Sequence, residues 1–236
     1  MLLILAASPI ETELLRKEII LLQILHCGSN PIFSGELRGH NILLVHGGIG
    51  QVNMAIHLTR LLNDYIPEAV LLCGCGGSYP GSDLKIGDLA LATSEYLGDL
   101  GVALSEEFIP LEQLDLPQYP QLAPITQQSF PLDPDLLNRA QKILPDATCG
   151  AFVTVNCCSG NPDLSMELQQ RSGGICENME GAAVAQVCAE FDIPLLELRG
   201  ISNPTGTHDP QQWDIVRGAE AVQAGLLQLL DNWPMT

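Results

Sequence analysis

Residues 178–203 read NMEGAAVAQVCAEFDIPLLELRGISN and contain the pattern that decides the fold. Apolar side chains recur there at helical spacing, which predicts an amphipathic helix with a stripe formed by Val184, Val187, Cys188 and Phe191. A nearly continuous apolar run, Leu195 to Ser202, follows at once and is typical of a strand buried on both faces. A helix joined directly to such a strand indicates an α/β fold.

The same alternation of apolar runs and helical patterns extends over the whole chain. The expected strands are Leu2–Ala7, Asn41–His46, Ala69–Cys75, Asp88–Thr93, Gly150–Val155 and Leu195–Ser202. The expected helices are Glu11–Leu25, Val52–Tyr65, Pro134–Leu144, Met179–Phe191 and Gln211–Leu230. This order predicts a three-layer αβα sandwich with a central mixed, mostly parallel sheet. No repeat or linker divides the 236 residues, so we expect one domain, 1–236.

Composition limits the partners and the compartment. Ten Lys and Arg residues face 28 Asp and Glu residues, a net charge of -18 that repels a phosphate backbone, so we expect no nucleic-acid partner. No stretch reaches the roughly 20 apolar residues of a membrane span, and Met1–Ala7 lacks the basic leader of a signal peptide. Eight cysteines form no C-x-x-C pair or zinc-ligand spacing, which favours free thiols in a reducing cytoplasm. A thiol nucleophile stays open as an alternative.

One segment departs from the alternation. Residues Pro110 to Pro131 include five prolines and show no clear periodicity. A loop of this length inside a compact fold is usually functional or mobile. A lid, an oligomer contact and a plain surface excursion all fit this segment.

Two glycine-rich loops indicate a ligand site at the sheet edge. The run Gly47 to Asn53 ends one expected strand and opens a helix, and Gly74-Cys75-Gly76-Gly77 ends the next strand. Ligands of open α/β sheets bind at the carboxyl ends of strands, where glycines let backbone N–H groups approach them. We therefore expect Cys75, Gly76 and Gly77 to bind substrate. The G-x-G-x-x-G spacing of a dinucleotide site is absent, and tight turns alone would explain either loop taken singly.

Two carboxylates stand at expected helix starts near strand ends. Glu180 lies four residues before Val184, on the same inward face, and a buried carboxylate needs a partner or a ligand. Glu11 opens the first expected helix, whose face continues at helical spacing through Leu15, Ile19 and Leu22. A favourable interaction with the helix dipole would explain each one alone. Together they predict a cleft between strand ends and helix starts.

Asn203 falls at the carboxyl end of the strand that begins at Leu195. Its amide presents a donor and an acceptor together, which matches the edge of a purine or pyrimidine. An asparagine that starts a turn before Pro204 is the structural alternative.

These segments together resemble the nucleoside phosphorylase/nucleosidase superfamily. The most specific block is Met179-Glu180-Gly181-Ala182-Ala183 followed by Arg199-Gly-Ile-Ser-Asn, and the likeness also covers 7–15, 48–55, 70–77 and 87–101. With Glu177-Asn-Met-Glu-Gly and Trp213-Asp-Ile, the pattern is most similar to that of futalosine hydrolases. The resemblance implies a nucleoside phosphorylase-like fold and release of hypoxanthine from futalosine in menaquinone biosynthesis.

The resemblance also assigns roles to residues. It implies that Glu11 activates water and that Met179 and Glu180 hold the ribose. Methylthioadenosine/S-adenosylhomocysteine nucleosidases protonate adenine with an Asp where this chain has Asn203, a departure that favours hypoxanthine. Related phosphorylases often carry a phosphate-binding Arg where this chain has Leu72, which favours water over phosphate as nucleophile.

The resemblance further implies a small nucleoside as the substrate, no cofactor, no metal and a homo-oligomer. Three alternatives stay open: a methylthioadenosine-type nucleosidase, a phosphorylase, and a non-catalytic nucleoside-binding or storage member of the fold. Glu11 separates the last from the enzymes, because a protein without catalysis has no need of a carboxylate beside Glu180.

Overall fold

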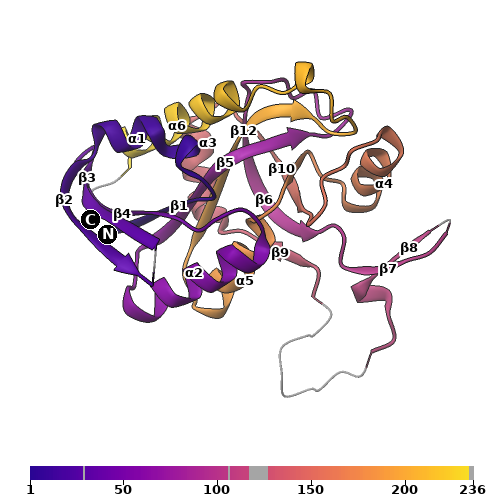
Figure 1. Cartoon of the computed structure of the whole chain (residues 1–236), viewed down its shortest axis with the longest axis horizontal. Coiled ribbons are helices and arrows are strands. Elements are labelled where there is room, and N and C mark those ends of the chain that lie inside the picture. Colours follow the sequence, from indigo (N-terminus) through magenta and orange to yellow (C-terminus); the bar gives the residue numbers. More distant parts are fainter. Residues whose placement is uncertain (29, 106, 117–126, 234–236) are drawn as a thin grey trace.

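A computed structural model describes residues 1–236 except 29, 106, 117–126 and 234–236. At its centre lies a 10-stranded sheet with the order β11-β10-β6-β12-β5-β1-β4-β3-β2 and with β9 beside β6 (Figure 1). Its strands are β1 (Leu2–Ala6), β2 (Ile20–Cys27), β3 (Asn30–Leu37), β4 (His40–His46), β5 (Ala69–Ser78), β6 (Leu89–Leu97), β9 (Ser129–Pro131), β10 (Thr148–Thr154), β11 (Cys176–Asn178) and β12 (Leu195–Pro204). The short strands β7 (Gly101–Ala103) and β8 (Phe108–Pro110) pair separately.

The sheet is mixed, as the sequence predicts. Parallel ladders join β4, β1, β5 and β12 at the centre, where the apolar runs are nearly continuous. Antiparallel ladders add β3 and β2 at one edge. At the other end, β11 pairs with both β10 and β5, so that β5, β12, β6, β10 and β11 close into a ring. This closure brings the carboxyl ends of β5, β10 and β12 close to the short strand β11.

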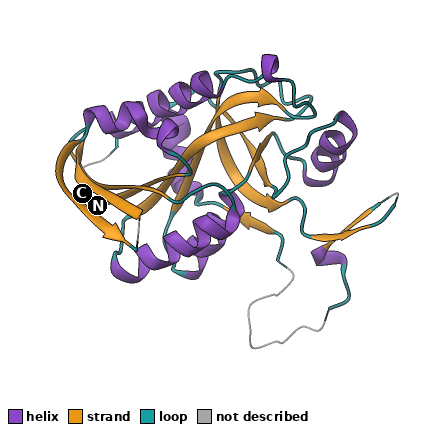
Figure 2. Ribbon diagram, in the orientation of Figure 1, coloured by secondary structure: helices purple, strands orange, loops and turns teal. Residues whose placement is uncertain are grey.

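Helices cover both faces of the sheet and complete the αβα sandwich (Figure 2). They are α1 (Glu13–Glu18), α2 (Gln51–Asp64), α3 (Pro134–Ile143), α4 (Pro162–Ser172), α5 (Gly181–Glu190) and α6 (Ile215–Asp231), with 3-10 turns at Pro9–Thr12, Leu111–Gln113 and Pro210–Gln212. Alternate residues of β1 serve the two faces. Leu3 and Leu5 join the core under α2 and α5, whereas Leu2 and Ile4 join the core under α3 and α6. Burial on both faces explains why the central strands lack polar alternation.

The expected helix Glu11–Leu25 is confirmed only for Glu13–Glu18, and the rest of the prediction is wrong. The chain forms a 3-10 turn at Pro9–Thr12, continues as α1 and then turns into β2, which pairs with β3. Leu15 is buried as expected, but Leu22 lies on β2 with 70% of its surface exposed. The apolar residues after Glu18 therefore belong to an edge strand. The β-branched isoleucines among them favour a strand over a helix. The spacing of the apolar residues does not reveal this preference.

Other elements are longer than expected or unexpected. Strands β5 and β12 run on through the glycine loop and through Asn203, because their ends pair with each other and the end of β5 also pairs with β11. Helix α4 was not predicted, although Asn161 caps it, Pro162 opens it and Gly173 ends it in the left-handed conformation. Helix α5 starts at Gly181 rather than Met179, and Glu180 is its N-cap residue.

The segment Pro110 to Pro131 is described only in part. The segment starts at the end of β8 and finishes at the end of β9, and residues 117–126 lie outside the described residues. The prediction of a lid or an oligomer contact therefore falls on a part of the chain that is not described. Among the helices of the described residues, none combines the length and the apolar character that crossing a bilayer requires.

Candidate active site

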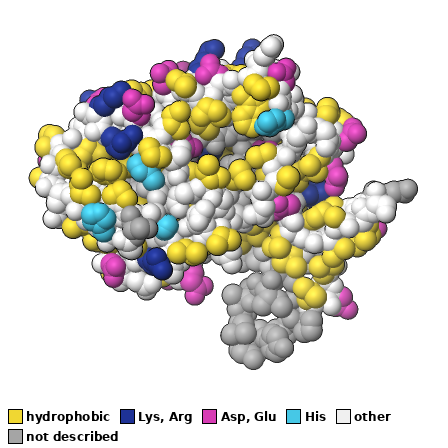
Figure 3. All heavy atoms as spheres, viewed as in Figure 1, with side chains coloured by type: hydrophobic (Ala, Val, Ile, Leu, Met, Phe, Trp, Pro, Cys, Tyr) yellow, Lys and Arg dark blue, Asp and Glu magenta, His cyan; other side chains and the backbone are white. Residues whose placement is uncertain are grey.

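A cavity of about 250 Å³ lies where the ends of β5, β11 and β12 meet the turn after β1. Every residue that the sequence singled out as a site residue lines it, namely Glu11, Cys75, Gly76, Gly77, Met179, Glu180 and Asn203. Ile10, Ile49, Trp213 and Ile215 add an apolar part to its wall. The space-filling view shows hydrophobic side chains gathered around a hollow on one face of the molecule (Figure 3). The site is therefore mainly apolar and contains a few polar groups, as small-molecule sites are.

Glu11 is held in place by three hydrogen bonds. Ser8 and Glu11 form a capping box around the 3-10 turn, in which the backbone N–H of Ser8 donates to Glu11 Oε2 over 2.8 Å. The Ser8 hydroxyl donates to the same oxygen over 3.1 Å, and the N–H of Cys75 donates to Oε1 over 3.0 Å. Only 6% of the Glu11 surface is exposed. These three donors fix the position of both carboxylate oxygens in the wall of the cavity.

Glu180 faces the cavity from the start of α5. Its Oε1 accepts from the backbone N–H of Gly50 over 3.0 Å, and its Oε2 forms an ion pair with Arg199 Nη1 over 3.2 Å. Asn178 fixes the turn below, because its Oδ1 accepts from the N–H groups of Glu180 and Gly181. Glu180 is 4% exposed and Arg199 is 1% exposed, so the ion pair is shielded from solvent. A carboxylate in such a place is well suited to bind ligand hydroxyls.

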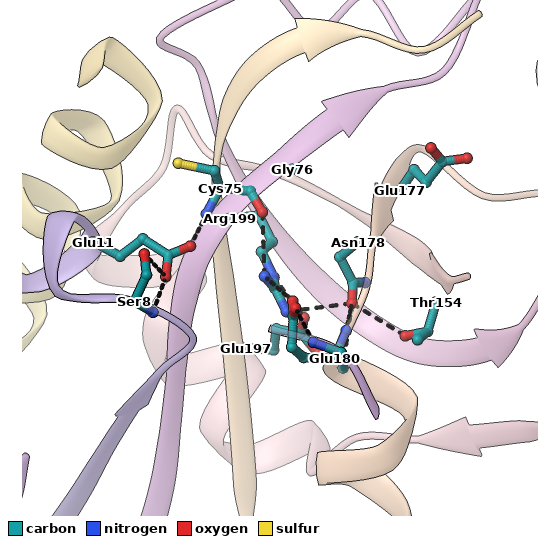
Figure 4. Close-up of polar contacts among 12 residues, drawn as sticks. Ser8, Glu11, Cys75, Gly76, Thr154, Glu177, Asn178, Glu180, Glu197 and Arg199 are labelled. Carbon is teal, nitrogen blue, oxygen red and sulfur yellow. Dashed lines mark hydrogen bonds and ion pairs between the residues drawn. The ribbon is translucent and has the colours of Figure 1, made fainter. Parts of the chain in front are cut away.

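The backbone of Cys75 connects the two carboxylates (Figure 4). Its N–H donates to Glu11, and its carbonyl accepts from Arg199 Nη1 over 3.2 Å. A Cβ at Gly74 would lie 2.7 Å from both Arg199 Nη1 and Glu11 Oε1, so both side chains reach over that glycine. Any larger residue at position 74 would push them apart. The strand that carries the glycine loop thus sets the separation of Glu11 from Arg199, the ion-pair partner of Glu180.

Asn203 lines the cavity near the end of β12. Its Oδ1 accepts from the Ser202 hydroxyl over 2.8 Å, and its Nδ2 donates to the carbonyl of Pro204 over 3.0 Å. An amide nitrogen has two hydrogens, so this pattern leaves one N–H of Asn203 for a ligand. The Ser202 contact holds the amide oxygen away from that role.

The cysteines that line the cavity are poor nucleophiles. Burial, together with the charge of Glu11, raises the pKa of Cys75 to about 12. Burial also raises the pKa of Cys158 to about 11, with Glu177 adding to the effect. Both thiols stay protonated near neutral pH, and the thiolate is the reactive form. The open alternative of a thiol nucleophile is therefore disfavoured.

Sequence reasoning missed several groups of the site. Arg199 enters the sequence analysis only as part of a motif, yet its side chain forms ion pairs with both Glu180 and Glu197. Its signal was available, since charges two residues apart on a buried strand share one face. Glu177 also lines the cavity and accepts hydrogen bonds from the Tyr79 hydroxyl and the Ser159 N–H, both over 2.9 Å. These partners come from the residue that follows β5 and from the loop after β10, and no local pattern links them.

Comparison with known proteins identifies the family of this chain. The phosphorylase superfamily model matches residues 2–231. The chain is 29% identical over 217 residues to a 5'-methylthioadenosine/S-adenosylhomocysteine nucleosidase of Tolumonas auensis, covering 89% of each protein. It is 32% identical over 197 residues to a futalosine hydrolase of Thermus thermophilus, covering 82% of this chain and 83% of the relative.

A solved structure agrees with the fold. The 5'-methylthioadenosine/S-adenosylhomocysteine nucleosidase of Neisseria meningitidis superposes with a TM-score of 0.83 at 22% identity, and 98% of each chain is covered. The match over nearly the full length, together with the central mixed sheet and its helical layers, shows that this chain belongs to the phosphorylase superfamily.

Proposed function

We propose that the protein is a purine nucleosidase that cleaves the N-ribosidic bond with water. The observation that carries this proposal is the pair Glu11 and Glu180, which reach one cavity from two sides of the Cys75 peptide. The relatives described above, one named a methylthioadenosine/S-adenosylhomocysteine nucleosidase and the other a futalosine hydrolase, support the same reaction.

The proposed reaction gives Glu11, Met179 and Glu180 separate roles. Glu11 accepts a proton from the attacking water. The water oxygen forms a bond to the anomeric carbon of the ribose, the bond to the base nitrogen breaks, and its electron pair leaves with the base. Met179 and Glu180 bind the ribose, and the charge of Glu180 stabilises the positive charge that develops on the sugar. The departing base takes up a proton from solvent and leaves as the free purine, and Glu11 then releases to solvent the proton that it accepted from the water.

Within this class we propose futalosine as the substrate and hypoxanthine as the released base. Asn203 supports this choice, because its free N–H suits the acceptor O6 of a 6-oxopurine, where a 6-aminopurine presents a donor. The apolar wall formed by Ile10, Ile49 and Trp213 suits a large 5' substituent with an aromatic ring. Methylthioadenosine is the second candidate, because the relative named a methylthioadenosine/S-adenosylhomocysteine nucleosidase matches over more of this chain than the futalosine hydrolase does.

A panel of nucleosides, incubated with and without phosphate, tests the proposal. Futalosine, inosine, methylthioadenosine and S-adenosylhomocysteine are compared, and the released base and sugar are separated by chromatography. We expect free hypoxanthine from futalosine at the highest kcat/KM. A higher value for methylthioadenosine would reassign the substrate but keep the reaction, whereas a failure to release base from any of them would contradict the nucleosidase proposal itself.

Turnover is expected to be independent of phosphate. The position that often carries a phosphate-binding Arg in related phosphorylases is Leu72, which is fully buried in the core. Arg199, the cation nearest the acids, is already paired with Glu180 and Glu197. The product should therefore be the free sugar, at equal rates with and without phosphate. Detection of a sugar 1-phosphate would show phosphorolysis instead.

Base preference is expected to depend on Asn203. The wild-type enzyme should prefer 6-oxopurine nucleosides, because a mismatched polar edge leaves buried groups unpaired at a cost of about 1–3 kcal/mol each. Asn203→Asp should move the preference toward the 6-amino base and lower the overall rate, since a carboxylate only accepts hydrogen bonds. The measurement is kcat/KM for futalosine and its 6-amino counterpart in both proteins. Equal values in the wild type would show that Asn203 does not read the base.

A further inference from the structure

Beneath the start of α5 lies a second, fully buried group of acids that the proposed reaction does not use. Glu95 on β6 and Glu197 on β12 each have no exposed surface. A Cβ at Gly181 would overlap a carboxyl oxygen of Glu95 and lie 2.7 Å from Glu197 Oε1. The two carboxyl groups therefore face each other across a space too small for one methyl group. Gly181 is the residue that leaves room for them.

The hydrogen bonds of this pair are complete except at one atom. Glu95 accepts from the Thr154 hydroxyl over 2.7 Å and from Asn178 Nδ2 over 2.6 Å. Glu197 Oε1 accepts from Arg199 Nε over 2.9 Å. Glu197 Oε2 is buried and has no hydrogen-bond partner among the described residues. A buried oxygen without a donor is costly, and the neighbouring carboxyl of Glu95 can supply a donor only when it is protonated.

The charges around the pair favour a proton on Glu95. Arg199 is the one cation that contacts this group in the described part of the chain, and it already faces the carboxylates of Glu197 and Glu180. Cys176 on β11 is a further titratable neighbour, and burial raises its pKa, so it stays neutral. Burial and the charge of Glu197 raise the pKa of Glu95 well above its usual range. Burial also raises the pKa of Glu197, although the ion pair with Arg199 opposes that effect.

We propose that Glu95 carries a proton and donates it to Glu197 Oε2, and that this pair holds Arg199 where it orients Glu180 and the Cys75 carbonyl. The pair acts through Arg199, so Glu95 and Glu197 are positioning residues. The proposal rests on the proposed function only in taking Glu180 as the group that binds ribose. The proposal predicts that replacing Glu95 and replacing Glu197 have markedly different effects on kcat/KM, although the two acids are equally buried and lie side by side.

Two isosteric substitutions separate the two acids. Glu95→Gln replaces a neutral acid by a neutral amide that can still donate to Glu197. Glu197→Gln removes the negative charge from beside the Arg199 guanidinium. We expect kcat/KM of Glu197→Gln to fall at least about tenfold below that of Glu95→Gln, mainly through misplacement of Glu180. Equal losses, or a larger loss in Glu95→Gln, would overturn the proposal, and so would a failure of Glu95→Gln to fold.

A second readout needs no turnover and therefore stays valid if the proposed substrate is wrong. Above about pH 5 the unfolded chain has lost the Glu95 proton while the folded protein keeps it, so wild-type stability from this group falls as pH rises toward the raised pKa. Glu95→Gln lacks this contribution. The ratio of the unfolding constants, wild type over variant, should rise about tenfold per pH unit from about pH 5.5 to 7 in urea titrations. A flat ratio would show that Glu95 is ionised.

Discussion

Glu11→Gln is expected to lower kcat about 10²- to 10⁴-fold, the range typical of a lost general base. A glutamine cannot take a proton from water. Its amide nitrogen would also face one of the donors that now bind the carboxylate, either Cys75 N–H or the Ser8 group. KM should change little, because the proposed ribose contacts belong to Glu180. The measurement is steady-state release of the base from the best substrate of the panel.

Glu13→Gln is the matched control for this change. Glu13 lies two residues further on, at the start of α1, and its carboxylate pairs with Lys17 on the surface. The same change of charge there should leave kcat within about twofold, because exposed ion pairs contribute little. If Glu11→Gln keeps near-full activity while the control does too, the water-activating group lies elsewhere in the cavity.

Glu180→Gln is expected to lower kcat/KM at least about 100-fold, with kcat falling and KM rising together. Both parameters should change because the ribose contacts exist in the ground state and strengthen as positive charge develops on the sugar. The substitution also removes the charge that faces Arg199 Nη1, and Gly50 N–H loses a charged acceptor. The measurements are KM and kcat for the best substrate of the panel. KM reports the loss of ground-state ribose contacts, and kcat reports the loss of charge stabilisation.

Glu190→Gln provides the control within the same helix. Glu190 is the last residue of α5 and is exposed, whereas Glu180 is the buried N-cap residue. The control should match the wild type in kcat, KM and thermal unfolding. A variant Glu180→Gln that binds substrate normally and loses only kcat would argue against a ribose contact in the ground state.

The central part of the fold could be predicted from the sequence because its signals are local. The apolar runs of β1, β4, β5, β6, β10 and β12 and the amphipathic patterns of α2, α3, α5 and α6 predict the elements that the structure contains. Their boundaries differ by a few residues, since the end of β5 is set by pairing with β11 and the end of β12 by pairing with β5. Residues 20–25 were predicted wrongly because an edge strand gains its stability from a partner strand.

The candidate site divides in the same way. Glu11, Glu180 and Asn203 stand at ends of elements, so their sequence positions alone indicated one edge of the sheet, and the structure places them around one cavity. The ion pair of Arg199 with Glu180 and the facing of Glu95 and Glu197 depend on the closed ring of strands. Those contacts join residues far apart in the chain. Burial and charge balance within the folded core decide them, and neither quantity can be read from the sequence before the strands are paired.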